Sequence, residues 1–128
     1  MEFNCHQFDA SGSITDVAAS ALPDGTLHVQ VVVNGLIYDR ARSARGTWST
    51  ASTLIDSNGS ITDVASVGLR NGDLHVEALV GGSVFDRVRK GTTGNGSSTA
   101  LQVDGNGAIF GTHATATPDG TLHVGTNA

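Results

Sequence analysis

The sequence has few of the residues that staple small domains together or mark membrane and nucleic-acid-binding proteins. A single cysteine, Cys5, excludes an intrachain disulfide framework, and no apolar run approaches the roughly 20 residues that a membrane-spanning helix needs. Basic residues are also scarce, because 7 Lys and Arg stand against 12 Asp and Glu, for a net charge of −5. This balance provides no basic face for a nucleic-acid backbone. We therefore expect neither a membrane span nor a nucleic-acid partner.

Helix signals and secretion signals are missing as well. No apolar period of 3.6 residues is sustained anywhere, so the chain is not expected to be helical. The N-terminal stretch MEFNCHQFDA lacks the charged-then-apolar pattern of a secretion signal, and we expect a soluble chain whose compartment the sequence leaves open. Only 2 prolines accompany 17 glycines, which indicates many tight turns between short ordered segments.

Internal repetition is the feature that the chain has in abundance. The phrase ITDVA occupies residues 14–18 and returns at 61–65, and the windows 8–42 and 55–89 agree at 18 of 35 positions without a gap. A third copy begins at residue 103 and runs to residue 128. Self-similarity at a period of about 47 residues is the mark of a solenoid, a propeller or an array of small modules. We divide the chain into repeats 8–54 and 55–102 and a partial repeat 103–128.

The apolar spacing within each repeat predicts strands. Small and β-branched residues lie on both faces of the segment that begins at Ile14, as expected of a strand packed on both sides. Asp-Gly and Asn-Gly turns then separate further β-rich runs. The expected strands after the first are 27–33, 36–42 and 47–56, with equivalents at 74–80, 83–89 and 97–104. Four short antiparallel strands in about 47 residues have the size of one β-propeller blade, so we predict an all-β fold of the propeller type. A β-prism and a β-trefoil fit a four-strand unit less well.

One repeat also has the sequence features of a known group of proteins. Residues 24–54, DGTLHVQVVVNGLIYDRARSARGTWSTASTL, resemble the blades of bacterial propeller lectins of the Photorhabdus type, in which a D-G turn and an apolar strand lead to G-x-L-Y and a loop closing on W-S. The blade length is also similar to that of the horseshoe-crab, tachylectin-like lectins. The resemblance covers nearly the whole chain, one blade at a time. It implies a non-enzymatic, multivalent carbohydrate-binding protein, a lectin, with equivalent sites between neighbouring blades.

The resemblance places the candidate sugar pockets on the third strand and the loop that follows it. A sugar pocket sets an apolar ring face against a few directed polar groups. The ligand-binding residues that we predict are therefore three aromatic side chains with two arginines as polar partners, namely Trp48, Tyr38, Phe85, Arg40 and Arg87. The chain departs from the family where further tryptophans are common, with Ala41 and Val88 on the third strands and Gly96 or Ser97 opposite Trp48. Tyr38 and Phe85 also suit packing between blades, and the arginines suit ion pairs between blades through Asp16 or Asp63.

The sequence gives weaker support for a metal site, a cofactor or a catalytic centre than for a sugar-binding site. His28, His75 and His123 recur at one place in the repeat, but equivalent positions on radially arranged blades are too far apart to share an ion. We therefore expect structural histidines whose imidazoles form hydrogen bonds between blade sheets. The segments 9–16 and 56–63 resemble part of a calcium loop, but a glycine-containing turn between strands explains them with fewer assumptions. We predict no metal site and no cofactor.

An enzymatic function is not expected either. No G-x-S-x-G elbow is present, and the nearest match to a sialidase Asp-box, residues 43–48, lacks both the Asp and the spacing. Repeated features favour a repeated binding site, whereas catalysis needs one asymmetric constellation. The alternative to a lectin is a non-catalytic scaffold or interaction propeller, or an engineered repeat fragment, without a sugar ligand.

The count of strands predicts an oligomer. The chain 1–128 holds two full blades and parts of others, fewer than the four to eight that propellers use. We expect residues 1–8 to supply a strand that completes a blade of a neighbouring chain, and two chains to close one ring of six blades. The predicted partners are therefore glycans and a second copy of the chain in a homodimer.

Overall fold

A computed structural model describes residues 12–128, which form ten β-strands and no helix. They form two four-stranded sheets and one two-stranded sheet, and within each sheet strands that follow one another in sequence pair antiparallel. The first sheet comprises β1 (Ile14–Ala21), β2 (Leu27–Val33), β3 (Leu36–Arg42) and β4 (Thr53–Asp56). The second comprises β5 (Ile61–Gly68), β6 (Leu74–Val80), β7 (Ser83–Arg89) and β8 (Leu101–Asp104), and the third β9 (Gly111–Ala116) and β10 (Leu122–Asn127). The expected all-β fold of four-stranded antiparallel sheets is confirmed.

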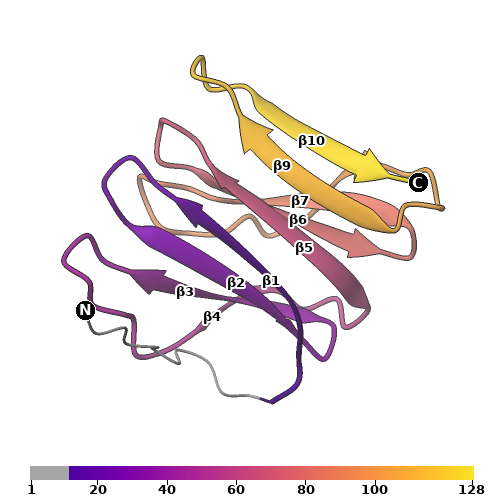
Figure 1. The fold of residues 1–128 in the computed structure, drawn as a ribbon, viewed down its shortest axis with the longest axis horizontal. Helices are drawn as coiled ribbons and strands as arrows, with labels where there is room; N and C mark the ends of the chain where they lie inside the picture. The colour runs from indigo at the N-terminus through magenta and orange to yellow at the C-terminus, as the bar shows by residue number, and fades with distance from the viewer. Residues whose placement is uncertain (1–11) are drawn as a thin grey trace, which may run out of the picture.

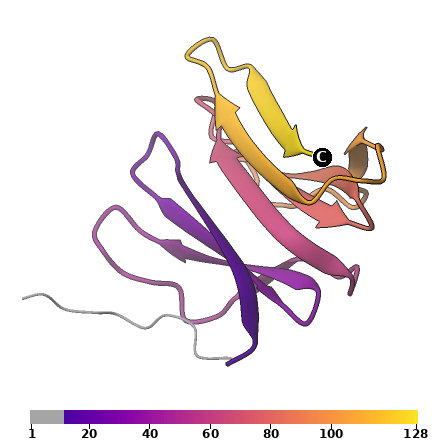
Figure 2. The same ribbon diagram turned by 45° about the vertical axis from the view of Figure 1, so that its right-hand side comes forward.

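The three sheets follow one another in the order of the repeats. Figures 1 and 2 both show β1, β5 and β9 side by side, with the remaining strands of each sheet leading away from them. The first strand of each repeat therefore packs against the first strand of the next. Each contact between sheets therefore joins one face of a sheet to the opposite face of the next.

Turn chemistry fixes the hairpin between the first two strands of every repeat. In the first repeat Leu22 N donates to Thr26 O and Gly25 N donates to Leu22 O, while Asp24 Oδ1 accepts from Thr26 N. The backbone bonds recur between residues 69 and 73 and between 117 and 121. An Asp or Asn side chain that bonds to a backbone N–H two residues on is a turn former in its own right, so these hairpins are specified locally.

The fourth strands are shorter than predicted. They begin at Thr53 and Leu101. The expected segment 47–52 contributes only an isolated bridge from Trp48 to Arg42, and Gly96 forms the equivalent bridge to Arg89 just before the expected segment 97–100. Side chains form hydrogen bonds with backbone groups that could otherwise pair the third strand with the fourth. Arg87 Nη1 donates to Ser97 O at 3.1 Å, and Ser97 Oγ accepts from Val88 N at 3.1 Å. Regular pairing with the third strand therefore resumes only at Thr53 and Leu101, five residues after each isolated bridge.

The first strand of the first repeat is not packed on both sides. Val17 is 52% exposed, whereas Val64 at the same place in the second repeat is 5% exposed. The difference arises because β5 has a strand of another sheet on each side, β1 and β9, whereas among the described residues β1 has only β5 of the second sheet beside it (Figure 1). A bulge after Ile14 turns Asp16 toward the second sheet and Val17 away from it.

Two apolar clusters fill the spaces between the sheets. Between the first and second sheets, the fully buried Val32 and Ile37 pack with residues of β5 and β6, which are Ile61, Val64, Leu74, Val76 and Ala78. Between the second and third sheets, Leu79 and Val84 pack with Ile109 and Val124. The core of the protein therefore lies between repeats, so each sheet depends on its neighbour for its buried surface.

Tight links join each repeat to the next. Both Gly59 N and Ile61 N donate to Gly35 O, at 3.0 and 3.2 Å. Gly35 has φ +77°, and a Cβ there would lie 2.1 Å from Gly59 O. Gly82 repeats this role with Gly107 and Ile109, so glycine is required at the link by both conformation and space.

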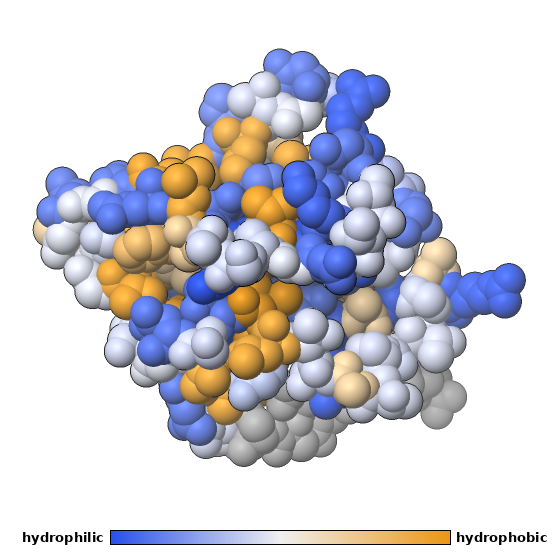
Figure 3. All heavy atoms as spheres, turned by 180° about the vertical axis from the view of Figure 1, so that it is seen from behind, coloured by the Kyte–Doolittle hydropathy of each residue, from blue (hydrophilic) through white to orange (hydrophobic). Residues whose placement is uncertain are grey.

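The surface of the molecule carries several exposed apolar side chains. Seen from behind, the molecule carries apolar patches among polar residues (Figure 3). The described residues include five large apolar side chains with high exposure, which are Val17, Leu54, Leu101, Val103 and Phe110. No helix in the described part of the chain is long and apolar enough to cross a membrane. The predicted strand 1–8 lies outside the described residues.

Candidate functional site

Each four-stranded sheet contains a buried polar trio on its second and third strands. In the first sheet the trio is His28, Gln30 and Asp39, and none of the three residues is more than 5% exposed. His28 Nδ1 lies 2.8 Å from Asp39 Oδ2, and Gln30 Nε2 donates to Asp39 Oδ1 at 2.7 Å. The predicted structural role of His28 agrees with this geometry, except that its partner is in the same sheet and not in a neighbouring one. These bonds fix the register of β2 against β3.

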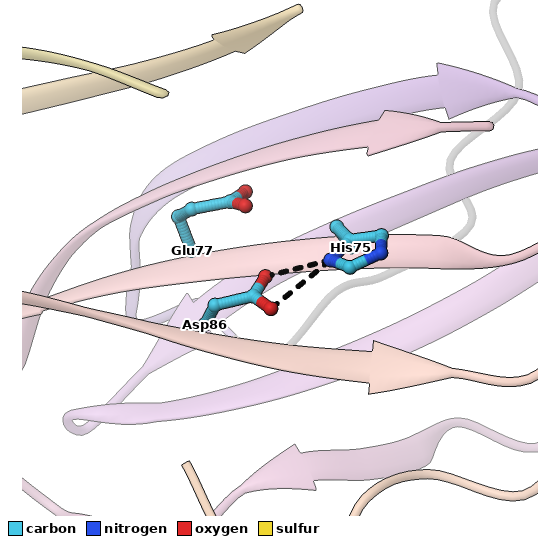
Figure 4. A group of neighbouring side chains, drawn as sticks. All are labelled: His75, Glu77 and Asp86. Carbon is cyan, nitrogen blue, oxygen red and sulfur yellow. Dashed lines mark hydrogen bonds and ion pairs between the residues drawn. The ribbon is translucent and has the colours of Figure 1, made fainter. Parts of the chain in front are cut away.

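The second sheet repeats the trio with one substitution. His75 Nδ1 lies 3.0 Å from both carboxylate oxygens of Asp86, but Glu77 stands where the first sheet has Gln30. Glu77 is fully buried (0% exposed). Its burial, and next its contact with the Asp86 carboxylate, raise the pKa of Glu77 to about 9. Figure 4 shows the Glu77 carboxylate in the same space as His75 and Asp86.

The aspartate of the repeated phrase ITDVA joins neighbouring sheets. Asp16 Oδ2 accepts from Val64 N at 2.8 Å, and Asp63 Oδ2 accepts from Thr112 N at 2.9 Å. Each carboxylate thereby satisfies a backbone N–H of the next repeat's first strand. Burial, and then the nearby Asp16 carboxyl, raise the pKa of Asp63 to about 6. The phrase recurs because the same bond is needed at each contact between repeats.

An ion pair provides a second bond between the first two sheets. Arg87 Nε donates to Asp56 Oδ2 at 2.9 Å, and Asp56 is only 6% exposed. An arginine does join neighbouring sheets at Arg87, but its partner is Asp56, the last residue of β4, and not Asp16 or Asp63. Asp56 Oδ1 and Asn58 Oδ1 accept from Asn58 N and Ser60 N, as expected of a turn rather than a calcium loop.

A groove lies between the hairpin turns of the first and second repeats. It has a volume of about 310 Å³, and both turns, the second-strand histidine and the end of β7 line it. Its lining residues are Leu22, Pro23, Asp24, Thr26, His28, Arg70, Asn71, Gly72, Arg89 and Gly91. An apolar wall beside a small number of directed polar groups is the usual composition of a small-molecule site.

The polar groups of the groove include both donors and acceptors. Hydrogen bonding from Thr26 lowers the pKa of Asp24 below its ordinary value, so this residue presents a carboxylate. Arg89 and Arg70 offer guanidinium donors, and one nitrogen of Arg70 already donates to Pro118 O at 2.6 Å. Because Nδ1 of His28 faces Asp39, Nε2 is the only ring nitrogen that a ligand could use. The groove therefore offers groups for a ligand that both donates and accepts hydrogen bonds.

The structure distributes the predicted site residues over two faces. Tyr38 pairs with Val31, which pairs with Val17, so Tyr38 lies on the face of the first sheet turned away from the second. Phe85 pairs with Ala78 on the face that packs against the first sheet, and both aromatic residues are half-buried. Trp48 is half-buried and bridges Arg42, with Gly96 at the equivalent place in the second repeat. These three aromatic side chains are not brought together in one sheet contact.

The two predicted arginines also differ from each other. Arg40 Nη1 lies 3.3 and 3.4 Å from the carbonyl oxygens of Ser49 and Thr50 in the loop of its own sheet. Asp9, which matches Asp56 in the repeat, lies outside the described residues. Arg87 lines a small cavity with Ile55, Val76, Val88, Arg89, Gly96 and Ser97. None of the five predicted ligand-binding residues lines the 310 Å³ groove.

Two groups of residues were not predicted from the sequence. Asp24 and Asn71 have the sequence pattern of turn-forming residues. The groove that they both line exists only because two sheets pack side by side. The trio residues Gln30, Glu77 and Asp86 could have been found, because polar residues at alternate positions of an apolar strand share one face with the histidine. No protein-family model and no curated protein matches the chain.

Proposed function

We propose that the chain is a carbohydrate-binding protein in which grooves between neighbouring repeats hold sugars. The groove between the first and second repeats carries this proposal. Leu22 and Pro23 offer an apolar wall for the C–H face of a pyranose ring, in place of the aromatic wall expected from the lectin resemblance. Asp24 and Arg89 lie in the same groove and can accept from and donate to sugar hydroxyls. The absence of an enzymatic function remains part of the proposal.

Repetition of residues that line the groove is the reason to expect several sites. Leu69, Asn71 and His75 hold the places of Leu22, Asp24 and His28 in the second repeat, and Pro118 follows in the third. Each site would bind weakly, and linked sites would gain avidity of about 10²- to 10⁴-fold on a multivalent surface. A lectin of this kind acts by cross-linking glycoconjugates.

A matched pair of arginines tests the site. A glycan array first selects the monosaccharide, and isothermal titration then compares Arg89→Ala with Arg42→Ala. Arg42 is the equivalent arginine of the first repeat, but it is exposed and does not line the groove. We expect Arg89→Ala to lower affinity about tenfold or more, because a charged hydrogen bond is worth about 1.5–3 kcal/mol. Arg42→Ala should bind as the wild type does.

The aromatic prediction is tested in the same experiment. Loss of binding in Trp48→Ala, with Arg89→Ala unaffected, would place the sugar at the loop of the first sheet and refute the groove. Unchanged affinity in Trp48→Ala would remove Trp48 from the pocket. No binding to any glycan would favour the second candidate, a non-catalytic scaffold. That candidate is supported by the use of Asp16, Asp63 and Arg87 in contacts between repeats.

We also propose that the sheets are blades of a β-propeller that a second copy of the chain closes. Each sheet packs one face against the opposite face of the next sheet. A contact of this kind forms a ring when the rotation from one sheet to the next adds up to a full turn. Val17 is 52% exposed on one face of β1. The equivalent face of β5, which carries Val64, is buried against the first sheet. A sheet of a second copy is the occupant with the matching shape. Light scattering should give about twice 13.0 kDa.

A charge on that face should disrupt the assembly. Val17→Asp should lower the mass to that of a single chain or unfold the protein, since a charge cannot be buried without a partner. Leu101→Asp is the control, because Leu101 is 68% exposed on the last strand of its sheet. A folded wild-type monomer of 13.0 kDa would refute the closure by a second copy.

A further inference from the structure

The buried trios of the two sheets have the same backbone frame but different hydrogen-bonding capacity. In the first sheet the Gln30 amide donates to Asp39, so one residue of the trio supplies the proton that the other needs. In the second sheet Glu77 replaces the amide, and its carboxyl group can donate to Asp86 only while it holds a proton. The two carboxyl groups of the second trio therefore share one space with a single histidine (Figure 4).

Glu77 has no partner of its own. Among the described residues, neither Oε1 nor Oε2 of Glu77 makes a hydrogen bond, although the side chain is fully buried. Its carboxylate is directed toward the space that His75 and Asp86 share (Figure 4). A buried carboxylate without a hydrogen bond is costly, and such groups are normally paired or bound to a metal.

The atoms of this trio are close enough for one ion. A nitrogen of His75 and one oxygen each of Glu77 and Asp86 all lie within 4.8 Å of one another. Ligand atoms around a tetrahedral zinc at about 2.0–2.1 Å are separated by about 3.3 Å. His75 Nδ1 and Asp86 are already 3.0 Å apart. Two carboxylates and a neutral imidazole would balance the charge of a divalent cation.

We propose that His75, Glu77 and Asp86 form a binding site for a divalent transition metal of the zinc type. An imidazole nitrogen with two carboxylate oxygens suits zinc, whereas calcium and magnesium prefer oxygen ligands throughout. Three protein ligands leave a fourth position for water or for a ligand atom. All three ligands come from one sheet, so the site does not require equivalent histidines of different repeats to converge. It is independent of the proposed sugar groove.

The first sheet provides the test, because its trio differs at one position. Isothermal titration with ZnCl₂ and metal analysis after dialysis should give one zinc per chain for the wild type. Glu77→Gln copies the first trio, so it should fold, and it should weaken zinc binding at least about 100-fold. Gln30→Glu should build a second trio and raise the stoichiometry to two. His123→Ala, which removes an exposed histidine, should change nothing.

Cobalt distinguishes this site from a thiolate site at Cys5. Bound Co²⁺ should give the weak visible bands of nitrogen and oxygen ligation, without a thiolate charge-transfer band. Circular dichroism establishes that each variant is folded. Zinc binding that is equal in the wild type and Glu77→Gln would overturn the proposal, as would the absence of binding to the folded wild type. In either case Glu77 is a buried carboxylic acid that keeps its proton.

Discussion

Replacement of Asp63 by asparagine should stabilise the protein at neutral pH. Asp63 lies beside Asp16 at the contact between the first two repeats, and burial together with this neighbour raises its pKa from 3.8 to about 6. The asparagine amide would keep a side-chain oxygen for the bond from Thr112 N, which is 2.9 Å long in the wild type. The substitution therefore removes a charge without removing the bond that the charge makes.

The pH window follows from the sign of the shift. Because the folded state holds the Asp63 proton more tightly than the unfolded state, the wild type is most stable below about pH 4 with respect to this group. Its stability falls as pH rises from about 4 to about 6 and is then constant. A pKa change from 3.8 to about 6 corresponds to about 3 kcal/mol at 1.36 kcal/mol per unit. Asp63 is only partly buried, so solvent screening reduces our expectation to about 1 kcal/mol.

Urea unfolding from pH 4 to pH 7, at one protein concentration, measures this effect. The difference between Asp63→Asn and the wild type should grow through the window and reach about 1 kcal/mol at pH 7. Asp16→Asn should give a similar gain, and the double variant should gain less than the sum because the repulsion is already gone. A difference that does not vary with pH, or a less stable Asp63→Asn at pH 7, would refute the reasoning.

Two further predictions concern the bonds that join repeats. Arg87→Ala leaves the buried Asp56 without its counter-ion and should cost about 3 kcal/mol in urea unfolding, whereas Arg40→Ala, which loses only two long bonds to exposed carbonyl groups, should cost about 1 kcal/mol or less. Equal losses would show that the Arg87 ion pair has no special weight. Gly35→Ala places a Cβ 2.1 Å from Gly59 O at φ +77° and should cost more than about 3 kcal/mol. Gly59→Ala also has a positive φ but meets no atom within 4 Å, so it should cost about 1 kcal/mol, and a loss as large as that of Gly35→Ala would contradict the steric argument.

Local sequence rules predicted the middle strands well. The bounds 27–33, 36–42, 74–80 and 83–89 agree with the structure because alternating β-branched residues end at Asp-Gly, Asn-Gly or Gly-Gly turns. The fourth strands were predicted too long, since the Arg87 and Ser97 side chains take ladder groups that propensity alone assigns to a strand. The repeated phrase indicated that Asp16 and Asp63 join neighbouring repeats. It did not indicate their partners, which are the backbone N–H groups of Val64 and Thr112.

The candidate sites depended more on contacts between sheets. The groove combines Pro23 and Asp24 of one hairpin with Asn71 of the next, and their 47-residue separation in sequence gives no sign that they share a cavity. The exposure of Val17 also follows from what packs against β1 and not from its own segment, because Val64 in an identical ITDVA phrase is buried. Identical local sequences therefore have different surroundings at the two places.

The most direct test of the proposed sugar groove is a ¹H–¹⁵N correlation spectrum recorded while the selected monosaccharide is added. Residues of both hairpin turns line the groove, so backbone amide signals of Asp24, Thr26, Asn71 and Gly72 should shift together along one binding curve. Signals of the exposed strand β8 should stay in place. If the shifts instead centre on Trp48, or if no signal of either turn moves throughout the titration, the groove between the first two repeats is not the binding site.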